Sequence, residues 1–264
     1  GFFHARSLSS FRGRVHGRPI DLERTPAWKL VVFNQDHDQI GNRATGDRLT
    51  ETVDAGGLAI AAVLTLTAPF TPMLFMGEEW AASTPWQFFT SHPEPELGKA
   101  TAEGRIAEFE KMGWDPDVVP DPQELSTFHN SKLNWDEPSS GDHAKLLALY
   151  RELIVLRRTR PELTDPRFSH LSSTYSDDRR WFRLDRGAVS VLANLGDEAV
   201  TLPLSAPSGI LLATDDGIEA TGETVALPAH SAVILATKVT IPERKPHHHG
   251  TAWGTGFDLR PHAV

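Results

Sequence analysis

The sequence predicts an α/β region with parallel strands, followed by an all-β sandwich. In the first part of the chain, two short apolar runs flank a segment rich in alanine and leucine, which is the pattern of a β-α-β unit. After residue 166, short apolar runs alternate with turn residues, which is typical of a sandwich. The 264 residues suffice for one large domain or two modest ones.

The composition excludes several classes of partner and site. Lysine and arginine number 26 and aspartate and glutamate number 35, so the net charge is −9. Nucleic acids and anionic membranes bind positively charged surfaces, so we expect neither as a partner. The chain has no cysteine, which excludes disulfides, thiolate zinc sites and thiol nucleophiles. Because this composition also suits a reducing compartment, and no signal peptide is recognisable, we expect a cytoplasmic protein.

The α/β region begins with a strand at residues 29–33 (KLVVF), because a continuous apolar run is typical of a parallel strand covered on both faces. A polar loop at residues 34–50 leads to a helix at 54–67, and a second strand follows at 72–76. Strands joined in this way lie parallel, with a right-handed crossover.

An apolar stretch at residues 58–76 reaches the length of a membrane-spanning helix. Pro69 and Pro72 interrupt it, and threonine recurs along it. We therefore interpret the stretch as part of a buried helix followed by a buried strand.

Two more helices are expected further along the chain. The first lies near residues 99–112, with Ile106 and Phe109 facing inward. The second begins at an N-cap, Asp142, and continues through Thr159, because its apolar residues recur at helical spacing and a proline follows.

The chain divides by pattern into three parts. We expect an α/β domain at residues 1–165, a sandwich at 166–238 and an irregular tail at 239–264, which contains three consecutive histidines at 247–249. The predicted sandwich strands lie at residues 181–184, 188–195, 200–204, 210–214, 224–227 and 232–237.

Polar residues gather where each of the two parallel strands ends. Residues 34–43 (NQDHDQIGNR) follow the first strand and residues 77–80 (GEEW) follow the second. Loops at these strand ends hold the active site in parallel α/β proteins, and so many polar groups are costly to bury without a purpose. Five of the seven tryptophans lie between residues 28 and 135. An acidic cleft with aromatic faces suits a sugar.

Other interpretations of these residues remain open. A loop can be polar because it is solvated and forms Asx turns. Glu78 or Glu79 can pair with an arginine and support the loop, and each tryptophan can belong to the core.

Residues 33–43 (FNQDHDQIGNR) resemble the seventh-strand motif of the α-amylase superfamily, in the form found in maltooligosyltrehalose trehalohydrolases. Residues 71–80 (TPMLFMGEEW) resemble the eighth-strand motif of the same family, and residues 131–135 (SKLNW) continue the similarity. The resemblance covers about residues 1–238. It implies the C-terminal part of a (β/α)8 TIM barrel, with strands seven and eight, followed by the sandwich.

The resemblance also implies a reaction and roles for individual residues. The family releases trehalose from maltooligosyl trehalose by retaining hydrolysis of the adjacent α-1,4 bond, without a cofactor or metal. Asp38 matches the acid that stabilises the transition state, and His37 matches a histidine that binds the same sugar. Four further residues are expected to bind substrate: Gln39, Arg43, Glu79 and Trp80.

Retention needs a nucleophile and a general acid, which are two close carboxyl groups. By resemblance these lie on barrel strands four and five, outside this sequence. Because the chain also begins at Gly1 rather than a methionine, we expect it to be the C-terminal portion of the enzyme, and to be inactive alone.

Asp36 departs from the family, which usually has asparagine before the His-Asp pair. We expect Asp36 to point away into a salt bridge, and the alternative is that its charge weakens the site. Two other functions stay open, namely another α-amylase-superfamily enzyme, such as a glycogen-branching enzyme, and a glucan-binding fragment without catalysis.

Overall fold

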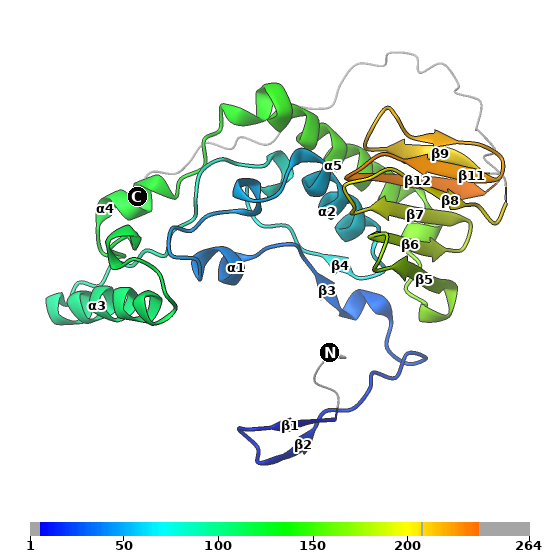
Figure 1. Cartoon of the computed structure of the whole chain (residues 1–264). Coiled ribbons are helices and arrows are strands. Elements are labelled where there is room, and N and C mark those ends of the chain that lie inside the picture. Colours follow the sequence, from blue (N-terminus) through cyan, green and yellow to red (C-terminus); the bar gives the residue numbers. More distant parts are fainter. Residues whose placement is uncertain (1–5, 207, 238–264) are drawn as a thin grey trace, which may run out of the picture.

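The computed structural model describes residues 6–206 and 208–237. These residues contain a β-α-β unit, two long helices and one short one after it, a small N-terminal hairpin and two larger antiparallel sheets (Figure 1). The α/β class and the sandwich-like C-terminal region are both confirmed. The predicted tail, with its three histidines, lies outside the described residues, and the division of the chain into three parts stays a prediction.

The β-α-β unit has the predicted order, but its strands are shorter than predicted. β3 (Val31–Val32) lies parallel to β4 (Thr71–Pro72). The predicted polar loop contains a short helix, α1 (His37–Gly41), before α2 (Ala55–Thr67) completes the crossover. Before this unit, a separate hairpin of β1 (Ser7–Ser9) and β2 (Arg14–His16) projects away from the other elements (Figure 1).

The helix α2 forms as the sequence predicts. Asp54 is its N-cap, and its carboxylate accepts the Gly57 N–H at 2.7 Å. The helix ends at Thr67, two residues before Pro69. Among the described residues, no helix has both the length and the apolar character needed to cross a membrane.

The later helices differ from prediction mainly in where they begin. α3 (Pro95–Lys111) begins before residue 99, with Pro95 in its first turn, and it buries Phe109 as predicted. α4 (Leu125–Asn130) was not predicted. α5 (Gly141–Thr159) ends where expected. Short 3-10 turns lie at Ala27–Lys29, Leu49–Glu51, Glu78–Trp80, Pro116–Val118, Glu137–Ser139, Pro161–Leu163 and Phe168–His170.

The prediction that Asp142 caps α5 is wrong. Ser140 is the N-cap residue, and Asp142 lies inside the first turn, where its carboxylate forms an ion pair with Lys145 at 2.8 Å. An acidic residue in the first turn stabilises a helix through the helix dipole. The two positions therefore favour the same residue type, and the sequence alone does not separate them.

The C-terminal region consists of two antiparallel sheets, with five strands in the order β5-β6-β7-β12-β9 and three in the order β10-β11-β8. Every predicted strand is present, and the polar edge strand β5 and the short β10 are additional. The strands are β5 (Leu171–Ser176), β6 (Trp181–Arg186), β7 (Val189–Asn194), β8 (Val200–Pro203), β9 (Ser208–Ala213), β10 (Glu219–Ala220), β11 (Thr224–Leu227) and β12 (Ser231–Thr237).

The five-stranded sheet is covered on both faces. Leu192 and Val233 on one face pack with the three-stranded sheet. Val191 and Ile234 on the other face pack against α2 and α5, in a cluster that includes Leu153. This double cover explains why β7 and β12 are almost continuously apolar and buried instead of alternating.

A buried arginine joins this sheet to the end of α2. Arg186, on β6, is 1% exposed and donates hydrogen bonds to the carbonyl oxygens of Thr67 at 2.7 Å, Leu163 at 2.9 Å and Asp165 at 2.8 Å. Burial and the nearby Arg157 lower the pKa of Arg186 to about 10, so it stays charged at neutral pH.

Arg157, on α5, completes the same contact. It donates to the carbonyl oxygens of Leu66 at 2.7 Å, Ala68 at 2.8 Å and Phe70 at 2.8 Å. The last carbonyl groups of a helix have no partner within the helix and carry its negative dipole end, so two cations there satisfy and stabilise them.

The opposite end of α2 contacts the sandwich through a histidine between two carboxylates. His230 lies in the turn before β12, where its Nδ1 is 2.5 Å from Asp54 and its Nε2 is 3.1 Å from Asp197. Arg180 also pairs with Asp197, at 3.3 Å. A side chain on Gly56 would meet the backbone of His230, so the helix and this turn are closely packed.

We expect Arg186→Met to lower the free energy of unfolding by at least about 3 kcal/mol, because it leaves several buried carbonyl groups unsatisfied at about 1–3 kcal/mol each. Urea unfolding of this chain measures the change. Arg151→Met, at an exposed position on α5, is the matched control. A loss from Arg186→Met no larger than that of the control would contradict the role of the buried guanidinium.

We expect the His230 contact to weaken as the pH rises. The hydrogen bond and charge of Asp54 raise the pKa of His230, so the folded state binds this proton more tightly than the unfolded state does. Its contribution is complete below about pH 6.5, the ordinary histidine pKa, and is lost as the pH rises through the raised pKa. Urea unfolding at a series of pH values measures this loss.

The matched variant is His230→Asn, because asparagine tolerates the positive φ of 48° at this position but does not titrate. Asp54→Asn is a second variant, since asparagine still caps α2. His230→Asn should lack the wild-type pH dependence in this window, and Asp54→Asn should keep only a reduced one, because Asp197 still contacts His230. Identical pH profiles for wild type and His230→Asn would disprove the contribution.

Candidate functional site

The short helix α1 follows β3 directly and carries the predicted His-Asp pair. Asp36 is its N-cap, and the carboxylate accepts the N–H groups of Asp38 at 2.7 Å and Gln39 at 3.3 Å. The Gln39 side-chain oxygen in turn accepts the Asp36 N–H at 3.0 Å. This reciprocal arrangement is a capping box.

The expectation of a salt bridge for Asp36 is therefore wrong. Its carboxylate is held by two backbone N–H groups at the positive end of a helix, which also compensates its charge next to Asp38. The spacing of Asp36 and Gln39 is the signal that could have predicted this helix, although the capping pattern is usually recognised with serine or threonine.

His37 and Asp38 lie side by side and face solvent. Their side chains are 65% and 68% exposed, and the distance from His37 Nε2 to Asp38 Oδ1 is 3.4 Å. The Trp86 ring meets His37 edge-on, with centroids 6.5 Å apart. Both groups are thus free to contact a ligand at the end of β3.

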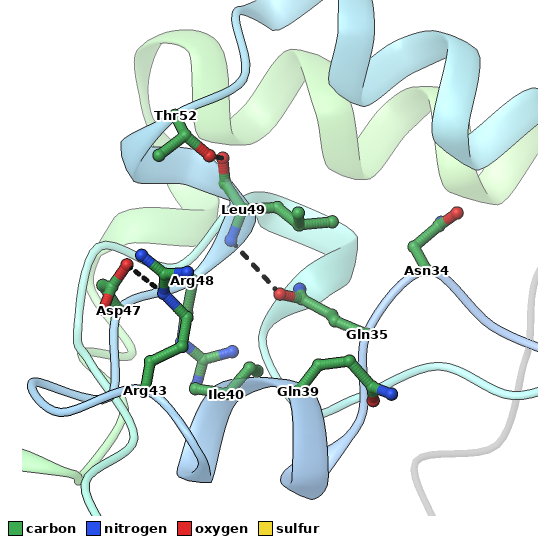
Figure 2. A pocket seen from close by; sticks show the side chains of 9 residues that line it. All are labelled: Asn34, Gln35, Gln39, Ile40, Arg43, Asp47, Arg48, Leu49 and Thr52. Atoms are coloured by element: carbon green, nitrogen blue, oxygen red, sulfur yellow. Dashed lines mark hydrogen bonds and ion pairs between the residues drawn. The ribbon is translucent and has the colours of Figure 1, made fainter. Parts of the chain in front are cut away.

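A pocket of about 270 Å³ lies beside α1 (Figure 2). Two of the predicted substrate-binding residues line it, Gln39 and Arg43. The Nε of Arg43 is 2.5 Å from Asp47, whose pKa is lowered by hydrogen bonds despite partial burial. The full lining is Asn34, Gln35, Gln39, Ile40, Arg43, Asp47, Arg48, Leu49 and Thr52.

Glu78 joins the ends of the two parallel strands. It is 7% exposed, and its carboxylate accepts hydrogen bonds from the Asn34 amide at 3.2 Å, the Tyr150 hydroxyl at 3.1 Å and the Phe75 N–H at 3.1 Å. Burial raises the pKa of Glu78. The Asn34 oxygen also accepts the Thr65 hydroxyl at 3.0 Å, so β3, β4, α2 and α5 meet at this carboxylate.

The predicted residues at the end of the second strand, Glu79 and Trp80, are less exposed than His37 and Asp38 on α1. Glu79 is half-buried. Trp80 is only 3% exposed, donates its indole N–H to Glu137 at 3.3 Å and packs against the 73% exposed Trp135. Its burial leaves no free face for a sugar, so the position of Trp80 does not support the predicted direct contact.

Arg48 is a residue of this site that sequence reasoning missed. Its guanidinium donates to the carbonyl oxygens of Thr84 at 2.6 Å and Met76 at 2.8 Å, and it lies 5.4 Å from the centre of the Phe75 ring. Arg48 is 3% exposed. Nothing in the polar sequence around it separates a buried arginine from a solvated one.

The comparisons with known proteins agree with this architecture. Residues 166–234 match a family described as a domain of unknown function, DUF3459. The chain is 34% identical to the crystal structure of a putative alpha amylase from Salmonella typhimurium, with a TM-score of 0.73 over 88% of this chain and 39% of that one. The fold and the strand-end site thus define a relative of the α-amylases.

More specific relatives are malto-oligosyltrehalose trehalohydrolases. The chain is 61% identical over 235 residues to that of Rhizobium sp. and 48% identical to that of Mycobacterium tuberculosis, in each case over 89% of this chain. It spans about two fifths of the length of these relatives. The predicted resemblance to the C-terminal portion of this family is confirmed.

We expect Asp36→Ala to destabilise the chain by about 1 kcal/mol and to speed amide exchange at Asp38 and Gln39, because both N–H groups lose their acceptor. Asp36→Asn should leave the exchange and the stability nearly unchanged, since asparagine caps equally well. Hydrogen exchange followed by NMR measures both variants. Equal exchange in Asp36→Ala and wild type would contradict the capping role.

Proposed function

We propose that this chain supplies the C-terminal part of a retaining α-glucan hydrolase, which releases trehalose from maltooligosyl trehalose by cleaving the adjacent α-1,4 bond. The observation that carries the proposal is the exposed His37–Asp38 pair on α1, immediately after the first of two adjacent parallel strands. The chain is 61% identical to a relative named for this activity, which supports maltooligosyl trehalose as the substrate. We also propose a cytoplasmic location.

The exposed carboxylate of Asp38 suits the stabilisation of a positively charged sugar. Glycoside hydrolysis passes through an oxocarbenium-like transition state, and a carboxylate that accepts hydrogen bonds from the sugar hydroxyls lowers its energy. His37 donates a hydrogen bond to the same sugar. Gln39 and Arg43 would contact the sugar from the adjoining pocket, and Glu79 would contact it from the end of β4.

In this proposal, β3 and β4 are strands seven and eight of a TIM barrel. The nucleophile and the general acid lie on strands four and five, which are outside this sequence. Two-stranded parallel sheets are not stable alone, and parallel strands are normally covered on both faces. Within residues 6–206 and 208–237, β3 and β4 pair only with each other, and Val31 is 57% exposed. Further strands beside them would cover this apolar surface.

The test is a chimera in which this chain replaces the matching C-terminal part of the Rhizobium sp. relative. We expect it to release trehalose from maltooligosyl trehalose, and we expect Asp38→Asn to lower kcat by at least about a hundredfold, because one transition-state contact is lost. Chromatography of the products over time measures both. Asp142→Asn, at an exposed position on α5, is the control.

Three results would contradict the proposal. Formation of new α-1,6 branches would indicate a branching enzyme instead. Binding of maltooligosaccharides by the chimera without turnover would indicate a glucan-binding role. An Asp38→Asn variant within a few-fold of wild type would show that Asp38 does not act at the reacting sugar.

A further inference from the structure

The helix that carries His37 and Asp38 is too short to hold itself in place. α1 has five residues, and an isolated helix needs roughly 12–15 residues to be even marginally stable. Both side chains are about two-thirds exposed, so the protein gives them little side-chain packing. Their positions therefore depend on contacts made by the rest of α1, namely by the buried side chain of Ile40 and by the backbone.

The C-terminal end of α1 is held by a residue from α3. The guanidinium of Arg105 donates a hydrogen bond from its Nη2 to the carbonyl oxygen of Gly41, the last residue of α1, across 64 positions of sequence. Gly41 also packs directly against the ring of Trp86, which a Cβ atom at this position would approach to 2.9 Å. The N-terminal end is held by the capping box of Asp36.

Arg105 is itself fixed between two aromatic rings. Its guanidinium carbon is 4.7 Å from the centre of the Phe88 ring and 4.4 Å from the centre of the Phe109 ring. Phe109 is 1% exposed, so this contact is anchored in the core. A stacked guanidinium offers its N–H groups in one fixed plane, and a positive charge suits the C-terminal end of a helix.

We propose that Arg105 is a positioning residue, which holds α1 so that Asp38 and His37 meet the reacting sugar. The inference deepens the proposed function and rests on it for the catalytic consequence. It gives α3 a role in the reaction, although none of its residues belongs to the strand-end motifs.

The positioning is tested first by amide exchange, in the chimera with the Rhizobium sp. relative, whose further strands would cover β3 and β4. We expect Arg105→Met to speed exchange at residues 39–42 at least about fivefold, because the methionine keeps an apolar contact with the rings but cannot donate to Gly41. Lys99→Met, at an exposed position on the same helix, should leave these rates unchanged. Unchanged exchange in Arg105→Met would overturn the inference, whether or not the protein is a trehalose-releasing enzyme.

The catalytic consequence is tested in the chimera with the Rhizobium sp. relative. We expect Arg105→Met to lower kcat about 10- to 100-fold with KM within about threefold, because a small displacement of a reacting group costs rate more than binding. Arg105→Lys should recover part of kcat, since lysine donates one hydrogen bond but does not stack as a plane. A merely structural role would lower the melting temperature without lowering kcat selectively over KM.

The two proposals fail in different ways. A wild-type chimera that releases no trehalose contradicts the proposed function, while faster exchange in Arg105→Met still supports the hold on α1. An active chimera in which Arg105→Met keeps kcat within twofold of wild type overturns the positioning role and leaves the proposed function intact.

Discussion

The C-terminal end of α2 is the point on which the rest of the structure depends. Arg186 and Arg157 arrive from the sandwich and from α5 and bind carbonyl groups between Leu66 and Phe70. These carbonyls lie at the end of the crossover helix and in the turn into β4. The buried Arg186 and the half-buried Arg157 thus fix the sheet, α5 and the turn into β4 relative to α2.

The position of α1 follows from this junction in two further steps. β4 leads into Glu78, whose buried carboxylate binds Asn34 at the end of β3 and Tyr150 on α5. α1 begins just beyond Asn34, at a place already set by the core. Its two ends are then held by the Asp36 cap and by Arg105. The exposed side chains of His37 and Asp38 are therefore positioned by contacts in which they do not themselves take part.

Periodicity was enough to predict elements that are defined by their own residues. The ends of α2 and the C-terminal end of α5 follow from a capping residue and from prolines, and β7 and β12 follow from apolar runs. Contacts across the fold have no local pattern. Arg186 lies on a strand, and the sequence around it does not distinguish it from a surface arginine. β5 is an edge strand with mostly polar residues, so it lacks the apolar run by which other strands were predicted. Trp80 is buried and donates its indole N–H to Glu137, 57 residues away.

Asp36 occupies a position at which aspartate and asparagine are equivalent for the structure of α1. Asparagine and aspartate both cap a helix through a side-chain oxygen, so α1 needs only that oxygen. The Asp36 carboxylate lies two residues before Asp38 and accepts hydrogen bonds from two backbone N–H groups of α1. The identity of the N-cap is therefore free to vary between these residues, whereas its hydrogen-bonding oxygen is not.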